Sequence, residues 1–117
     1  MNDKIYCYKA TILSVYDGDS CRADIDLGMK IFIRNEPLRL ARINAPEVRG
    51  AERPKGLLAR DALKKLIEGQ DVIIETQKDK KGKYGRYIAE IHIFQDGNWV
   101  NTSDYLVENG HAVYKEY

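Results

Sequence analysis

The fold prediction starts from one stretch, Leu38-Arg39-Leu40-Ala41-Arg42-Ile43-Asn44-Ala45-Pro46-Glu47. Its first half has the leucines of a buried strand, and its second half breaks at Asn44-Ala45-Pro46. Proline ends the strand because it lacks an N–H group and restricts the residue before it. The segment therefore holds Arg39 and Glu47 at the end of a buried strand, which is a position where functional side chains are often mounted.

The composition is that of an ordinary globular domain, and we expect a single domain over residues 1–117. The chain is 44% hydrophobic and 32% charged, with a formal net charge of +1. This near-neutral charge excludes a strongly basic coat, so nucleic acid would have to be bound by a local cluster. No run of residues has the length of a membrane span, and no association with a membrane is expected.

The two cysteines and the first residues bear on the compartment. Cys7 and Cys21 are too few and too unpatterned for a disulfide framework or a zinc site, so we expect reduced thiols. Residues 1–8 show no apolar core of a secretory signal. We therefore expect a cytoplasmic protein, with secretion left open if a leader has been removed.

Hydrophobic periodicity predicts five strands and two helices. The first helix has apolar residues at helical spacing between Pro54 and Glu68, and Gly69 is suited to end it. The second begins at Asn101 or Ser103, either of which could cap it, and runs to Glu108. The predicted strands are residues 5–15, 20–26, 30–34 with a resumption at Leu38 after a bulge or edge break, 72–76 and 86–94.

This order predicts the fold class. Helices do not alternate regularly with strands, which argues against a doubly wound parallel sheet. We predict a mainly β (α+β) domain, a five-stranded Greek-key barrel of the OB-fold type, with one helix after the third strand and a C-terminal helix.

Three patches carry residues suited to chemistry on a phosphodiester: Asp17-Gly18-Asp19, Arg39 with Asn44 and Glu47, and Lys83-Tyr84-Gly85-Arg86. Carboxylate and carbonyl oxygens suit a hard cation such as Ca²⁺, and a free carboxylate can activate water. Two guanidinium groups can hold the phosphate and stabilise the charge that develops on its oxygens.

Each patch also has a plainer interpretation. Asp-Gly turns are common, so Asp17 and Asp19 could be turn residues only. Arg39 and Glu47 could form an ordinary ion pair. The lysines of residues 78–81 suit a solvated loop.

Taken together, the patches resemble the staphylococcal nuclease (thermonuclease) family of Ca²⁺-dependent nucleases built on an OB-fold. The motifs follow the family's order and spacing over roughly residues 10–114. They are Asp17-Gly18-Asp19-Ser20, residues 39–47, Lys83-Tyr84-Gly85-Arg86, and Val100-Asn101 followed by Leu106-Val107-Glu108-Asn109-Gly110.

The resemblance implies roles for matching residues. Asp19 would be the carboxylate ligand of one Ca²⁺ ion, with the backbone carbonyl of Ala45 as a second ligand. Glu47 would be the general base, while Arg39 and Arg86 would bind the phosphate and stabilise the transition state. The implied substrate-binding residues are Lys83, Tyr84 and Tyr114.

One position departs from the family pattern. Asn44 stands where the family usually has a second metal-binding aspartate. Its amide oxygen can still be a ligand, but the site loses one negative charge. We therefore expect Ca²⁺ to bind more weakly, or to lean more on the substrate phosphate.

The resemblance implies a metal-dependent nuclease that cleaves DNA or RNA, with a preference for single strands, and leaves 3′-phosphate ends. We expect the chain to be a monomer. The first alternative is an OB-fold module that binds nucleic acid with weak or no catalysis, since such folds bind single strands by basic grooves and stacking. The second is a protein-interaction domain, which predicts no response to metal or nucleotide.

Overall fold

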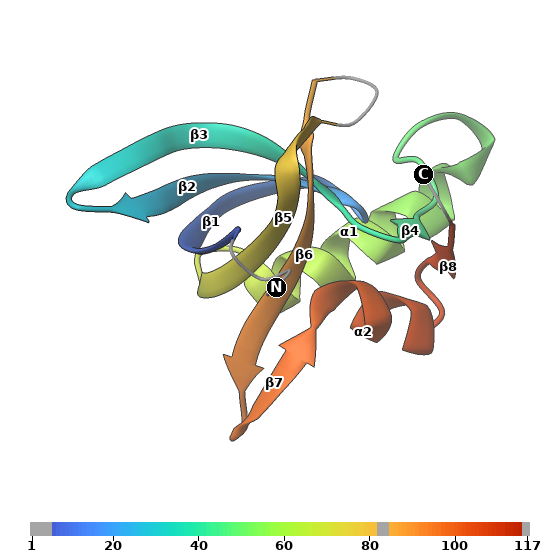
Figure 1. Ribbon diagram of the computed structural model, residues 1–117. Coiled ribbons are helices and arrows are strands. Elements are labelled where there is room, and N and C mark those ends of the chain that lie inside the picture. The colour runs from blue at the N-terminus through green and yellow to red at the C-terminus, as the bar shows by residue number, and fades with distance from the viewer. Residues whose placement is uncertain (1–5, 82–84, 116–117) are drawn as a thin grey trace.

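The computed structural model describes residues 6–81 and 85–115, with only the backbone of residues 77–81 (Figure 1). Its main sheet follows the order β3-β2-β1-β5-β6-β7, and β3 also pairs with β6. This extra pairing closes five strands into a barrel. The barrel strands are β1 (Cys7–Asp17), β2 (Ser20–Gly28), β3 (Ile31–Leu40), β5 (Asp71–Lys81) and β6 (Tyr87–Gln95).

Two helices and three short strands complete the fold. The helices are α1 (Arg53–Ile67), preceded by the 3₁₀ turn η1 (Gly50–Glu52), and α2 (Thr102–Glu108). β7 (Asn98–Asn101) extends the main sheet, while β4 (Ile43–Asn44) pairs with β8 (Val113–Tyr114) in a separate two-stranded sheet. The predicted α+β barrel, with a helix after the third strand and a C-terminal helix, is confirmed. No helix in the described part of the chain is long and apolar enough to cross a membrane.

The core lies inside the barrel and beneath α1. Inward-facing residues alternate along the strands, as expected where one face of a strand is buried. The same core takes in one face of α1 and reaches Leu106 of α2. Fully buried members include Ile12, Ala23, Leu38, Leu40, Leu63, Ile67, Ile74 and Ile91.

Several element boundaries differ from the predictions. β3 is continuous, and the expected interruption is a bulge: its register with β2 shifts between Ala23 and Ile25, and Asn35 has φ +54°. β5 continues to Lys81, beyond the predicted end at Thr76, because its pairing with β6 resumes there. The short strands β4, β7 and β8 were not predicted. Asn101, rather than Ser103, caps α2 by accepting a hydrogen bond from the Asp104 N–H at 3.0 Å.

In Figure 1, β2 and β3 project as a long hairpin on one side of the molecule, while β4 and β8 lie on the opposite side beside α1. The β1–β2 turn, the end of β3 and the β4 segment meet at this second side, because Leu40 N–H donates to Asp19 O at 2.9 Å and Ala45 N–H donates to the Asp19 carboxylate at 2.9 Å. The fold thus assembles the candidate site from segments that are far apart in the sequence.

Candidate nuclease site

The first part of the site is the two-residue turn between β1 and β2, which contains Gly18 and Asp19. The Asp19 N–H donates to the Asp17 side chain at 3.1 Å, which fixes the turn. Gly18 allows close packing, since a Cβ there would lie 2.7 Å from the Cβ atoms of both Ala45 and Ala59. The turn is therefore pressed between the segment after β4 and helix α1.

Asp19 lies at the centre of the site, and the residue is only 7% exposed. Its Oδ2 accepts a hydrogen bond from the Ala45 N–H at 2.9 Å and lies 3.3 Å from Nη2 of Arg39. Burial, together with the neighbouring Asp17, raises the pKa of Asp19 to about 6, even though Arg39 acts in the opposite direction. A buried carboxylate of this kind is better accommodated when a further cation is present.

Arg39 is held rigidly at the end of β3. In the antiparallel ladder between β2 and β3, Arg39 is paired with Ser20. The guanidinium is buried, and it donates to the carbonyl oxygens of Leu40 at 3.0 Å and Ile43 at 3.1 Å. With Asp19 as its ion-pair partner, the group is preorganised, which is what electrostatic stabilisation of a developing charge requires.

Arg86 reaches the same cluster from the start of β6. The parallel pairing of β3 with β6 places Leu38 opposite Tyr87, the residue after Arg86. Nη1 of Arg86 donates to the Ser20 hydroxyl at 2.8 Å, and that hydroxyl lies 3.4 Å from Oδ1 of Asp19. Asp19 is therefore linked directly to Arg39 and, through Ser20, to Arg86.

Ser20 belongs to the motif Asp17-Gly18-Asp19-Ser20, but the sequence predicted no function for it. Its side chain is buried and connects a carboxylate with an arginine. The available signal was weak: a small polar residue next to a candidate ligand at the start of a strand. Only the register with β3 reveals that it faces the site.

Asn44 and Glu47 lie beside this cluster on the surface. Asn44 belongs to β4, pairs with Val113 of β8, and is exposed. Glu47 follows β4 in the loop before α1 and is also exposed, while its backbone N–H donates to Oε1 of Glu52 at 3.2 Å. Asn44 and Glu47 thus lie on either side of the buried Ala45, whose N–H donates to the Asp19 carboxylate.

Tyr114 lies in a different set of contacts. Its hydroxyl donates to Oδ1 of Asp104 at 2.8 Å, which raises the pKa of the Tyr114 hydroxyl. The Arg42 guanidinium carbon lies 5.8 Å from the centre of its ring, and Arg42 also forms ion pairs with Asp104 and Glu90. Tyr114 remains connected to the site through its backbone, because β8 pairs with β4. Lys83 and Tyr84 lie outside the described residues.

The donor set bears on whether a metal ion fits. The Asp19 carboxylate lies next to Asp17 in the β1–β2 turn and contacts the segment of Asn44 and Ala45 through the Ala45 N–H. Hard cations such as Ca²⁺ prefer such ligands. No group of three or more His, Cys, Asp or Glu suited to a metal occurs in residues 6–81 and 85–115. Asp19 and Asp17 are therefore suited to a hard cation by the type of their donor atoms, while the described residues offer it little negative charge.

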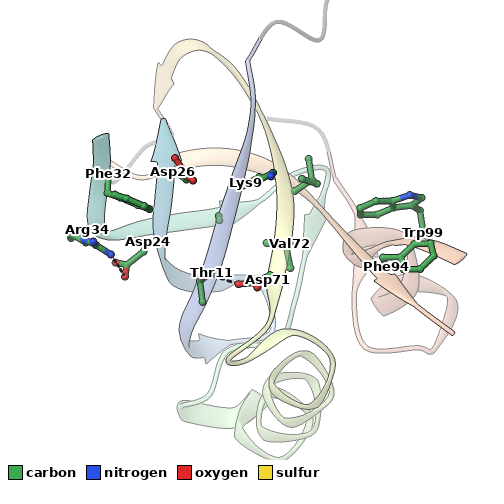
Figure 2. Close-up of a pocket in the computed structure, with 12 residues that line it drawn as sticks. Lys9, Thr11, Asp24, Asp26, Phe32, Arg34, Asp71, Val72, Phe94 and Trp99 are labelled. Carbon is green, nitrogen blue, oxygen red and sulfur yellow. Dashed lines mark hydrogen bonds and ion pairs between the residues drawn. The ribbon is translucent and has the colours of Figure 1, made fainter. Parts of the chain in front are cut away.

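A large hollow lies elsewhere on the molecule. It has a volume of about 530 Å³ and lies on the outer face of the sheet, where none of the candidate site residues lines it. Figure 2 shows Phe94 and Trp99 on one side and Phe32 and Arg34 on the other, with Lys9 and Asp71 between them. We call this hollow the outer groove.

Comparisons with known proteins agree with the geometry. The family described as staphylococcal nuclease homologue matches residues 37–117, which include Arg39, Glu47 and Arg86 but not Asp19. The chain is also similar to an uncharacterized protein of Methanocaldococcus jannaschii, with 28% identity over 120 residues. That match covers 90% of this chain and 58% of the archaeal protein, so the chain spans little more than half of its relative's length. The chain belongs to the family of staphylococcal nuclease homologues.

Proposed function

We propose that this protein is a metal-dependent nuclease that hydrolyses phosphodiester bonds of DNA or RNA. The observation that carries the proposal is the buried cluster in which Asp19 contacts Arg39 at 3.3 Å and is joined to Arg86 through Ser20. A domain that only binds nucleic acid has no need to gather two arginines and a buried carboxylate at one point, with the exposed Glu47 on the segment that contacts Asp19.

In this mechanism Glu47 is the general base that takes a proton from the attacking water. Its exposure leaves room for water and for a substrate strand. Arg39 and Arg86 bind the phosphate and stabilise the charge that builds up on its oxygens in the transition state. Both arginines are already oriented by hydrogen bonds, so little reorganisation is needed when the substrate arrives.

Asp19, the Asn44 amide oxygen and the Ala45 carbonyl would hold one Ca²⁺ ion. When bound, the ion would supply positive charge beside the phosphate. Asp19 carries the only full negative charge among these three ligands, so the substrate phosphate contributes to the affinity of the site. Lys83, Tyr84 and Tyr114 are proposed to contact the substrate strand, in which unpaired bases are preferred and cleavage leaves 3′-phosphate ends.

The test is the degradation of denatured DNA and of RNA by the native chain with Ca²⁺, with Mg²⁺ and with chelator, beside Glu47→Gln. A general base contributes about 10²–10⁴-fold to the rate, so the variant should lose most of its activity. Glu108→Gln, which changes an exposed carboxylate at the end of α2, is the matched control. A Glu47→Gln variant that cleaves at the native rate would refute the role of Glu47.

The second candidate is a nucleic-acid-binding module without catalysis. It is favoured by Asn44 and by the lack, in the described part of the chain, of a carboxylate-rich metal group. The same assay separates the two functions when binding is measured alongside by fluorescence anisotropy with a labelled single strand. A native chain that binds the strand but does not cleave it, whichever cation is added, would establish the module.

A further inference from the structure

Three residues of η1 and the beginning of α1 contact the backbone of Glu47 and Val48. The Glu47 N–H donates to Oε1 of Glu52 at 3.2 Å, and Nη1 of Arg53 donates to the Val48 carbonyl oxygen at 2.9 Å. Between these two contacts, the helix backbone at Gly56 lies directly against the segment. A Cβ at Gly56 would lie 1.9 Å from the Glu47 carbonyl oxygen and 2.9 Å from the Val48 nitrogen.

Glycine at position 56 lowers the stability of the helix, which indicates that the close contact between Gly56 and the Glu47 carbonyl is important. Glycine inside a helix is less favourable than alanine by about 1 kcal/mol. Gly56 is buried in α1, and no side chain larger than hydrogen can occupy its position while the Glu47 carbonyl stays in place. The helix therefore gives up intrinsic stability at a position where its backbone touches the loop that carries Glu47.

The same face of α1 also touches the other half of the site. Ala59 lies three residues after Gly56, and positions three apart share one face of a helix. A Cβ at Gly18 would come within 2.7 Å of the Ala59 Cβ, so this face packs closely against the turn that carries Asp19. One rigid helix thus sets the distance between the Asp19 turn and the Glu47 loop.

We propose that Glu52, Arg53 and Gly56 are positioning residues. They hold the Glu47 carboxylate at a fixed position relative to Asp19 and Arg39. None of the three needs to touch the substrate. The inference rests on the proposed role of Glu47 as the general base. An exposed carboxylate on a loop has many orientations, and a displacement of about 1 Å can lower a rate by roughly 10²-fold. Fixing the Glu47 backbone on both sides removes much of that freedom.

The first experiment compares kcat and KM on denatured DNA for Gly56→Ala and for Gly69→Ala. Gly69 follows the same helix, has φ +77°, and has no atom within 4 Å of an added Cβ. Alanine there strains the backbone without touching the loop, so it controls for lost stability. We expect Gly56→Ala to lower kcat on the order of 10²-fold with KM unchanged, and Gly69→Ala to keep the native kcat.

The exposed residue Glu52 provides two variants that do not threaten the core. Glu52→Ala removes the acceptor of the Glu47 N–H, whereas Glu52→Gln keeps an oxygen that can accept the same hydrogen bond. We expect Glu52→Ala to lower kcat and Glu52→Gln to restore most of it. Equal rates for both variants and the native chain would overturn the part assigned to Glu52, whether or not Gly56→Ala folds.

A double variant separates positioning from general damage. If Gly56 acts through Glu47, adding Gly56→Ala to Glu47→Gln should leave the residual rate unchanged, because the base is already absent. A further fall by the same factor as in the native background would overturn the proposal while leaving Glu47 as the base. A native rate in Glu47→Gln alone would instead refute the general base, and positioning with it.

A readout that needs no cleavage completes the test. The backbone amide resonances of Glu47 and Val48 should shift or broaden in Gly56→Ala and Glu52→Ala, and stay in place in Gly69→Ala. Unchanged resonances in the first two variants would overturn the proposal even for a chain that cleaves nothing.

Discussion

The two concave or polar regions of this molecule are built in opposite ways. At the candidate site, Asp19, Arg39 and Ser20 are buried and joined by short polar contacts. In the outer groove, Phe94 and Trp99 are more than half exposed, and about 530 Å³ is left open. The outer groove therefore lies away from the residues suited to chemistry. Preorganised charge is what identifies the candidate site in this small barrel.

The electrostatics of the two regions differ in the same way. Arg39 has buried carbonyl and carboxylate partners, whereas Arg34 of the outer groove pairs with Asp24 at 3.1 Å on the surface and lies 4.3 Å from the centre of the Phe32 ring. A surface pair of this kind contributes little and is screened by salt. We expect substitutions in the two regions to affect different measurements.

The largest contrast should come from exchanging arginine for lysine in each region. Arg39→Lys removes the planar group that contacts Asp19 and two carbonyls, and lysine cannot reproduce these contacts. We expect kcat to fall about 10²–10³-fold, as when one oriented donor is removed. Arg34→Lys should leave kcat unchanged. Steady-state rates on denatured DNA would check this, and equal rates for the two variants would erase the distinction between the regions.

Packing provides the next test. Gly18→Ala forces a Cβ to within 2.7 Å of the Cβ atoms of Ala45 and Ala59, and overpacking of this kind lowers the free energy of unfolding by about 1–3 kcal/mol. Leu58 is an α1 residue that is 62% exposed, so Leu58→Ala should change the free energy of unfolding by no more than about 0.5 kcal/mol. Urea unfolding followed by circular dichroism measures both. Equal free energies of unfolding for the two variants would mean that the turn at Gly18 packs less tightly against Ala45 and Ala59 than described.

One negative charge can be added to the proposed metal site. Asn44→Asp adds a carboxylate beside Asp19 and Ala45, and should tighten Ca²⁺ binding on the order of tenfold. Asn98→Asp adds the same charge at an exposed position of β7, far along the chain from the site, and is the matched control. Isothermal titration calorimetry compares them. If both variants tightened binding equally, the effect would be one of net charge rather than of a ligand.

The smallest effect on catalysis should come from the outer groove. Trp99→Ala breaks the edge-on contact with Phe94, whose ring centre lies 5.3 Å away, and should lower the free energy of unfolding by about 1 kcal/mol. We expect kcat/KM to remain at the native value, because no candidate site residue lines the groove. A rise in KM would place part of the substrate in the groove and weaken the contrast between the regions.

The fold was predictable where local periodicity is strong. The helix expected over 54–68 spans Arg53–Ile67, and the alternation of apolar residues located all five barrel strands. Strands β4 and β8 have two residues each and carry no periodic signal, since they exist only through pairing with one another. The end of β5 was missed because residues 78–81 are rich in lysine, although their backbone pairing with β6 resumes at Lys81.

The sequence supplied candidate site residues but not the contacts between them. Resemblance selected Asp19, Arg39 and Arg86, and the structure brings these three together. The role of Ser20 depends on the pairing of β2 with β3, and the close approach at Gly56 depends on how a helix packs on a loop. Both arise from three-dimensional register, which a motif does not encode.

The parallel pairing of β3 with β6 has a consequence for how the protein loses function. It joins Leu38, Arg39 and Leu40 to Tyr87, Ile88 and Ala89, and it is the pairing that closes the barrel. This seam has three residue pairs, compared with seven between β1 and β2. Opening this seam would separate the strand of Arg39 from that of Arg86 while the hairpins on either side stay folded. The proposed nuclease activity would then report on barrel closure, and we expect heating to abolish it before the circular dichroism signal changes.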